Sequence, residues 1–183
     1  MNNQNATIPH TKQLTVTALM TAALCLIAPF SIPLPFSPVP ISLATFVLYL
    51  DIFILGPKLG TISCILYLLL GFVGLPVFSG FGGGIGRLFG PTGGYMIGYL
   101  FLIIIGGNIN NFSKGKTLFS AFGLLLGTAV TYLFGTAWLS MQMDLTFIQG
   151  LAAGVLPYLP GDFLKIIVAL IIGPVLQNRI RQL

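Results

Sequence analysis

Asp162 and Lys165 are the two ionisable side chains whose placement most suggests chemistry. They lie three residues apart in the motif PGDFLK, inside an apolar stretch near the C-terminus. This spacing puts both on one face of a helix, and ionisable residues within apolar membrane helices are costly and mark functional sites. Side by side, a carboxylate and an ammonium can hold a small ligand that carries N–H donors and a carboxylate. Alternatively, Asp162 complements the dipole of its helix and simply pairs with Lys165.

Arg87 and Tyr95 are further candidates for ligand contact. Arg87 is the only charge in the segment PVFSGFGGGIGRLFGP, where it can supply a second cation or extend its side chain toward the membrane interface. Tyr95 and Tyr99, four residues apart, fit either a pocket wall or an interfacial aromatic belt, and we prefer Tyr95 because it lies nearer the surface. Asp51 is interpreted as structural, with a polar neighbour near Lys58.

The sequence contains no set of residues suited to catalysis. His10 is the single histidine and lies in a polar segment, and no Ser, His and Asp set is available. A GxxxxGK[ST] loop is missing, and the glycine-rich region lacks the strand and helix context of a dinucleotide site. Cys25 and Cys64 lie in apolar runs and are assigned to packing. We therefore expect a non-enzymatic protein without a metal or cofactor.

The elements that must position these residues are membrane helices. Of the 183 residues, 56% are hydrophobic and 6% charged, and the mean hydropathy is +1.00. A span needs roughly 20 mostly apolar residues. We predict an all-helical membrane protein of one domain, with a polar tail at residues 1–13 and six spans at residues 14–30, 41–57, 59–75, 92–107, 118–139 and 160–176. A short surface helix is expected within residues 144–159, because Pro157 and Pro160 interrupt any continuous helix there.

Basic residues indicate the orientation of these spans. Most of them fall on the side of the two termini, at Lys12, Lys58, Lys114, Lys116, Arg179 and Arg181. Cytoplasmic loops collect Lys and Arg, so both termini are predicted to be cytoplasmic. The net charge of +5 then reflects topology, and no nucleic-acid partner is expected.

The opposite, external face carries unusual apolar loops. Residues 31–40, SIPLPFSPVP, are proline-rich and uncharged and should form a stiff extended lid. Irregular backbone at membrane depth is tolerated only against protein or a cavity. A binding pocket under these loops is our interpretation, although each loop taken alone can also be a simple tight turn.

Ala18 and Ala22 in the first span have the AxxxA spacing that lets another helix approach closely. Packing within the chain and docking of a separate subunit are both consistent with this spacing.

Several motifs together resemble the biotin-specific S components, the BioY family, of energy-coupling factor (ECF) vitamin transporters. They are LPVFSGFGGGIGRLFGPTGGYMIGY (residues 75–99), PGDFLK (160–165), IPLPFSPVPIS (32–42) and GPKLG (56–60). The likeness runs across nearly the whole chain. Where the family pattern suggests a glutamine, this chain has Ala44, and Asp51 replaces a small apolar residue.

The resemblance implies a six-helix subunit of the bacterial plasma membrane that binds biotin from outside with high affinity. It also implies docking, through the face of Ala18 and Ala22, to a transmembrane scaffold and two ATPase subunits. Its site residues carry over to Asp162, Lys165, Ser79, Gly80, Arg87 and Tyr95. An autonomous secondary transporter of a small carboxylated solute is the alternative, but the chain lacks the ion-relay residues usual in that class.

Overall fold

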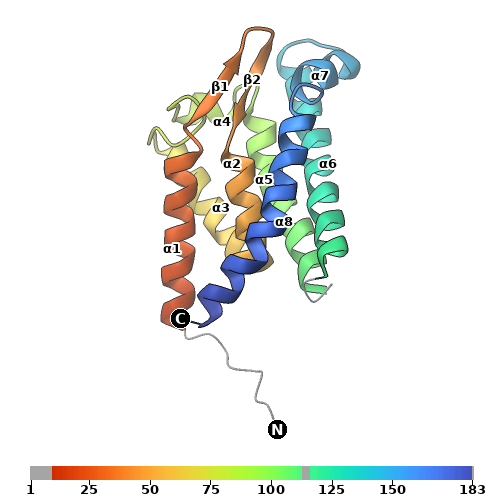
Figure 1. Cartoon of the computed structure of the whole chain (residues 1–183). Coiled ribbons are helices and arrows are strands. Elements are labelled where there is room, and N and C mark those ends of the chain that lie inside the picture. Colours follow the sequence, from red (N-terminus) through yellow and green to blue (C-terminus); the bar gives the residue numbers. More distant parts are fainter. Residues whose placement is uncertain (1–9, 113–115, 183) are drawn as a thin grey trace.

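The computed structural model describes residues 10–112 and 116–182, which form an upright helical bundle with a hairpin at one end (Figure 1). The helices that run along the bundle are α1 (His10–Ile27), α2 (Ala44–Ile54), α3 (Gly56–Phe72), α5 (Gly93–Phe112), α6 (Thr117–Gln142) and α8 (Leu159–Gln182). Among the described helices, α5, α6 and α8 are long and apolar enough to cross a membrane, and α2 and α3 are apolar but shorter. The chain is therefore mostly helical, with at least three membrane-spanning candidates.

The prediction of an all-helical chain is wrong in the proline-rich segment. Strands β1 (Ser31–Leu34) and β2 (Ser37–Ser42) form an antiparallel hairpin in which Ile32 pairs with Ile41. The second predicted span began at residue 41, but the helix begins only at Ala44. Proline fixes an extended backbone angle and restricts the residue before it to extended geometry. The alternating prolines therefore favour strands over a helix.

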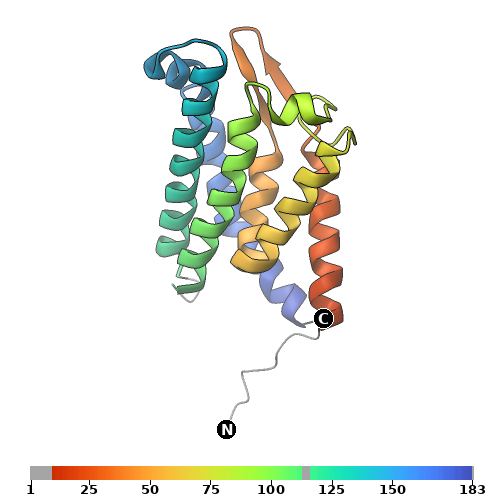
Figure 2. The same cartoon turned by 180° about the vertical axis from the view of Figure 1, so that it is seen from behind.

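The chain reverses direction between α2 and α3, which Figure 2 shows from behind. Leu55 alone separates the two helices. Gly56 has a φ of 69°, a left-handed conformation that is inexpensive for glycine. This sharp corner brings the end of α2 and the start of α3 together in one place.

Helices α5 and α6 pack closely because glycines line their contact. A Cβ atom at Gly98 would lie 2.8 Å from Cγ2 of Thr131, and one at Gly127 would lie 2.9 Å from the carbonyl oxygen of Leu102. Small residues are the usual means by which membrane helices bring their backbones together. The pair forms a firm wall on one side of the bundle.

A short helix was expected within residues 144–159, and α7 (Phe147–Gly154) is found there. Its first turn is fixed by a capping box, in which the Gln149 amide donates to Thr146 Oγ1 at 3.3 Å and the Thr146 amide donates to Gln149 Oε1 at 2.9 Å. The turn that holds Pro157 separates α7 from α8. Helix α7 and the one-turn helix α4 (Ile85–Leu88) both lie at the hairpin end of the bundle.

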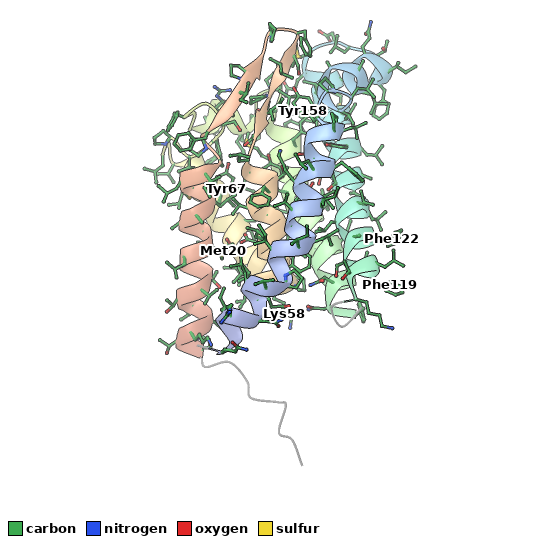
Figure 3. The ribbon with its side chains drawn as sticks, viewed as in Figure 1. Met20, Lys58, Tyr67, Phe119, Phe122 and Tyr158 are labelled. Atoms are coloured by element: carbon green, nitrogen blue, oxygen red, sulfur yellow. The ribbon has the colours of Figure 1, made fainter. Side chains whose placement is uncertain are left out.

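The start of α1 and the end of α8 lie at the same end of the bundle, opposite the hairpin (Figure 1). Figure 3 places Lys58 toward this end and Tyr158 toward the hairpin. The predicted polar tail is helical from His10 onward, while residues 1–9 and Lys114 lie outside the described residues. We refer to these two ends as the termini end and the hairpin end.

Candidate functional site

The Asp162 and Lys165 pair forms as the sequence suggested, in the first turns of α8. Lys165 Nζ donates to Asp162 Oδ1 at 2.8 Å. It also donates to the Ser42 carbonyl oxygen at 2.6 Å and to Thr45 Oγ1 at 3.1 Å. An ammonium has three protons to donate, so Lys165 is fully bonded. The lysine thereby ties α8 to the end of β2 and the start of α2.

Asp162 is bonded just as completely. Its Oδ1 accepts from Thr45 Oγ1 at 3.2 Å in addition to Lys165, and its Oδ2 accepts from the Tyr132 hydroxyl of α6. The side chains of Lys165 and Asp162 are only 14% and 9% exposed. Charges buried to this degree persist when they are paired and hydrogen-bonded. The donors and acceptors of this cluster are therefore held rigidly. A ligand can bind here by replacing some of the hydrogen bonds within the cluster.

Sequence reasoning did not identify Thr45, Tyr132 and Ser42 as members of this cluster. Thr45 and Tyr132 are 117 and 30 residues from Asp162 along the chain, so no local spacing connects them. The one available signal for Thr45 was its position a few residues after the predicted lid at residues 31–40.

Two small voids lie beneath β2. The pair void, of about 50 Å³, is lined by Asp162, Lys165, Thr45, Tyr132 and Tyr158 among others. The arginine void, of about 40 Å³, is lined by Arg87, Ser79, Phe78, Thr92 and Met96 among others. Both voids share Val39, Pro40, Ser42, Tyr95 and Tyr99. They are neighbouring parts of one region, separated by two tyrosines of α5.

The structure brings five of the six predicted ligand residues to these voids directly, and Tyr95 is central because it lines both. Its hydroxyl lies 3.3 Å from Thr136 Oγ1 of α6. Ser79 lines the arginine void. Gly80 follows Ser79 in a turn with a φ of 71° and donates its amide to the Pro29 carbonyl, which makes it a positioning residue for the loop.

Arg87 lines the arginine void and is also exposed to solvent. Helix α6 holds the loop that follows α4, because Trp138 Nε1 donates to the Gly90 carbonyl at 3.0 Å and Gln142 Nε2 donates to the Phe89 carbonyl at 3.2 Å. Within the described residues the Arg87 guanidinium has no ion pair. It is available to an anion at the outer margin of the site.

The hairpin is fastened over the voids at Ser37 and Tyr158. Ser37 Oγ donates to the Ala153 carbonyl at 2.7 Å and lies 2.8 Å from the Tyr158 hydroxyl, which also donates to the Val39 carbonyl. Burial raises the pKa of Tyr158, so its hydroxyl stays protonated as a donor. We call this contact the latch. The predicted lid is thus a strand pair with a defined closing contact.

This arrangement offers two polar ends and an apolar middle. Asp162 and Lys165 present an acceptor and a donor side by side, Arg87 presents a cation, and aromatic rings lie between. Pockets for small ligands usually measure about 300–1,000 Å³. The two voids are far smaller, so the hairpin must move before a ligand of that size can enter.

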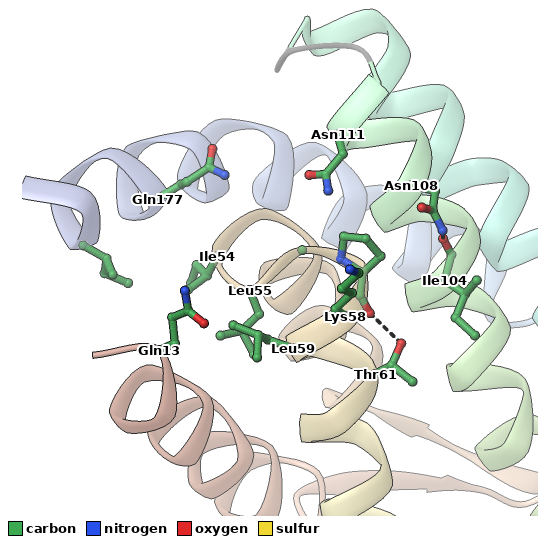
Figure 4. Close-up of a pocket in the computed structure, with 13 residues that line it drawn as sticks. Gln13, Ile54, Leu55, Lys58, Leu59, Thr61, Ile104, Asn108, Asn111 and Gln177 are labelled. Atoms are coloured by element: carbon green, nitrogen blue, oxygen red, sulfur yellow. Dashed lines mark hydrogen bonds between the residues drawn. The ribbon is translucent and has the colours of Figure 1, made fainter. Parts of the chain in front are cut away.

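A much larger cavity lies elsewhere, at the termini end, and none of the predicted ligand residues lines it. It measures about 920 Å³ and is bounded by the α2–α3 corner and by side chains of α1, α5 and α8. Figure 4 shows Gln13, Lys58, Asn108, Asn111 and Gln177 around it. Its lining is mostly apolar with several amides. No interlocked network like that of Asp162 is found among its described residues.

Ala18 and Ala22 are exposed on α1, whereas Thr17, Thr21 and Leu24 form its buried face. The alanine stripe therefore points away from the rest of the described chain. Packing inside the chain, one of the two explanations of the AxxxA spacing, does not account for these residues.

Three comparisons relate the chain to known proteins. A family model described as the BioY family matches residues 1–182. A probable biotin transporter BioY from Pyrococcus horikoshii is 37% identical over 167 residues, which are 91% of this chain and 97% of the relative. The biotin transporter BioY of Lactococcus lactis is 36% identical over 177 residues, covering 93% and 90% of the two chains.

A solved structure is similar over nearly the whole length. It is the crystal structure of the S-component for biotin from an ECF-type ABC transporter, and it superposes with a TM-score of 0.86 at 33% sequence identity. The match covers 97% of this chain and 95% of the other.

Proposed function

The chain belongs to the BioY family, and from this premise we propose that it is the high-affinity biotin-binding S component of an ECF-type ABC uptake transporter. It is a transport protein and not an enzyme. The single observation that carries the site assignment is the placement of Asp162, Lys165 and Arg87 around Tyr95 and Tyr99 beneath the hairpin.

The functional groups of biotin are chemically complementary to the side chains of the proposed site. Its ureido ring carries N–H donors beside a carbonyl acceptor, which suits the neighbouring carboxylate of Asp162 and ammonium of Lys165. Its thiophane ring suits the walls of Tyr95, Tyr99 and Phe78. Its carboxylate then pairs with Arg87, or with Lys165 if the ligand lies the other way round.

Biotin amide distinguishes these two orientations because it lacks the carboxylate charge. If the carboxylate pairs with Arg87, the Arg87→Ala variant should bind biotin and biotin amide with nearly equal affinity, while the unaltered protein prefers biotin. In the reverse orientation the carboxylate pairs with Lys165. The Arg87→Ala variant should then still prefer biotin over biotin amide, and the Lys165→Ala variant should lose this preference.

Equilibrium binding of biotin to the purified protein in detergent tests the proposed ligand, with thiamine and riboflavin as competitors of other chemistry. Tight binding that is selective for biotin and is lost in Asp162→Asn supports both ligand and site. Asp144→Asn is the matched control, because it removes the same charge from an exposed position. Folded protein that binds no biotin contradicts the proposal.

We propose further that α1, α2, α3, α5, α6 and α8 all cross the bacterial plasma membrane, with both termini in the cytoplasm. The common location of the start of α1 and the end of α8, and of Lys58 toward that end, supports this topology. A reporter active only in the cytoplasm should work at either terminus. Activity of a reporter placed in the Pro35–Phe36 turn instead contradicts this orientation.

Ala18 and Ala22 are proposed as the surface that docks a transmembrane scaffold subunit, which in turn carries two ATPase subunits. Their exposure on α1 supports this role. Ala18→Trp and Ala22→Trp should leave biotin binding unchanged and abolish ATP-dependent uptake. Uphill uptake by the isolated chain in liposomes without an ATPase would instead identify an autonomous secondary transporter.

A further inference from the structure

Asp51 is an ionisable group for which the proposed transport site has no use. It lies in the last turns of α2, is 0% exposed, and neither of its carboxylate oxygens has a hydrogen-bond partner among the described residues. A buried carboxylate without a counter-ion is among the costliest arrangements in a protein. Within a membrane bundle such a residue indicates a function by default.

The surroundings of Asp51 contain hydroxyls and a thiol but no cation. Ser63 and Cys64 of α3 are close enough to interact with the carboxyl. Lys165 of α8 is already bonded to Asp162, and this is the one ion pair found among the described residues. The other titratable groups on the helices packed against α2 are His10, Lys12 and Cys25 of α1, Lys58 and Tyr67 of α3, Tyr95 and Tyr99 of α5, and Arg179 and Arg181 of α8. The cations among them belong to the first turns of α1 and α3 and the last turns of α8, and none whose side chain the structure describes forms an ion pair with Asp51.

A strip of buried hydroxyls connects this carboxyl with the termini end. Thr21 Oγ1 donates to Ser63 Oγ at 3.0 Å and to the Thr17 carbonyl at 2.9 Å. Thr17 Oγ1 donates to the carbonyl of Gln13 at 2.8 Å, and Gln13 lines the 920 Å³ cavity. From the other side, Leu55 also lines this cavity and donates its amide to the Asp51 carbonyl, one helical turn away. Asp51 therefore lies just beyond the inner wall of the cavity.

We propose that Asp51 is a proton-binding site in the interior of the bundle, filled from the termini-end cavity. A hydronium ion gives its proton to one carboxylate oxygen and leaves as water. The resulting neutral acid donates its O–H to Ser63 Oγ, which retains a lone pair after accepting from Thr21. Protonation removes the buried charge. The carboxyl therefore stays in its neutral acid form as long as α2 is packed against α3.

Binding of this proton makes the free energy of unfolding depend on pH in a defined direction. A solvated aspartate ionises near pH 4, so unfolding at neutral pH releases the proton that the folded chain holds. The free energy of unfolding therefore falls as pH rises. Asp51→Asn, which resembles the neutral acid in shape and charge, removes this dependence.

Infrared spectroscopy of the purified chain in detergent at neutral pH tests the proposal without any ligand. The chain has three acidic residues, all Asp, and Asp162 is ion-paired. A carboxylic-acid C=O band should be present in the unaltered protein and in the control Asp144→Asn, and missing in Asp51→Asn. Its absence from the unaltered protein overturns the proposal. If Asp51→Asn does not fold, Ser63→Ala replaces it: the band must shift, and an unshifted band contradicts the assignment.

Thermal unfolding in buffers from mildly acidic to mildly alkaline gives an independent readout. The melting temperature of the unaltered protein and of Asp144→Asn should fall as pH rises, whereas that of Asp51→Asn should change less. Equal pH dependence in all three proteins contradicts the proposal. Adding sodium ions at constant pH should not raise the melting temperature of the unaltered protein more than that of Asp51→Asn. If sodium stabilises the unaltered protein and not Asp51→Asn, the site binds a metal cation instead of a proton.

Discussion

The hairpin end and the termini end of the bundle differ in how their polar groups are arranged. At the hairpin end, Asp162, Lys165, Thr45 and Tyr132 satisfy one another beside voids of about 40 and 50 Å³. At the termini end, a cavity of about 920 Å³ is lined by amides and apolar side chains without such a network. We place the proposed recognition site at the hairpin end because its donors and acceptors are preorganised, and not because of empty volume.

Two lysines, one at each end, give the strongest test of this difference. Lys165→Ala removes a buried partner and leaves Asp162 uncompensated, so biotin affinity should fall by about 2–5 kcal/mol, roughly 30-fold or more. Lys58→Ala, at the exposed corner of the large cavity, should leave the dissociation constant unchanged. Equal losses in both variants would remove the distinction between the two ends.

Arg87 tests how far the hairpin-end site extends. Because Arg87 is exposed, Arg87→Ala should weaken binding by about tenfold, mainly through slower association, and the loss should shrink at high salt. Stopped-flow measurement at two ionic strengths reports both effects. A loss as large as that of Lys165→Ala, and independent of salt, would show that Arg87 is buried when biotin is bound.

The latch tests whether the hairpin retains the ligand. Tyr158→Phe removes the hydroxyl that contacts Ser37 and Val39, at a cost of about 0.5–1.5 kcal/mol. Biotin dissociation should become faster by up to about tenfold. Thr61→Val is the control, since it removes a hydroxyl that is bonded to the Pro57 carbonyl beside the termini-end cavity. Unchanged dissociation in Tyr158→Phe would separate the hairpin from ligand retention.

Asn111 and Gln177 provide the smallest expected effect. Both line the large cavity, Asn111 exposed and Gln177 half-buried, and surface substitutions usually change stability by less than about 0.5 kcal/mol. Asn111→Ala and Gln177→Ala should each keep biotin affinity within about twofold, as measured by calorimetry. A marked loss would make the termini-end cavity part of the recognition site.

The sequence predicted the pairing of Asp162 and Lys165 in the candidate site, because both lie on one element. Asp162 and Lys165 were recognisable because an i, i+3 pair in an apolar helix is both local and costly. Thr45 and Tyr132 come from α2 and α6, and their contacts with Asp162 depend on how three helices pack. Helix packing leaves no periodic signal at single polar positions.

In the fold, too, local features were predicted and contacts between distant segments were not. The proline-rich segment was predicted to be extended, which the hairpin agrees with, but the pairing of β1 with β2 was not foreseen. Proline fixes the angles of its own residue and not the partner of its strand. The termini-end cavity also escaped prediction, because it results from the abrupt turn at Gly56 and the splay of helices around it.

At the proposed site, we expect the closed hairpin to limit how fast biotin is captured. Voids of about 40 and 50 Å³ are too small for the ligand while the latch at Ser37 and Tyr158 is closed, so we predict that binding has two steps. As the biotin concentration rises, the observed association rate should level off at the rate of hairpin opening instead of increasing without limit. On this prediction, the hairpin controls the rate of ligand entry as well as covering the proposed site.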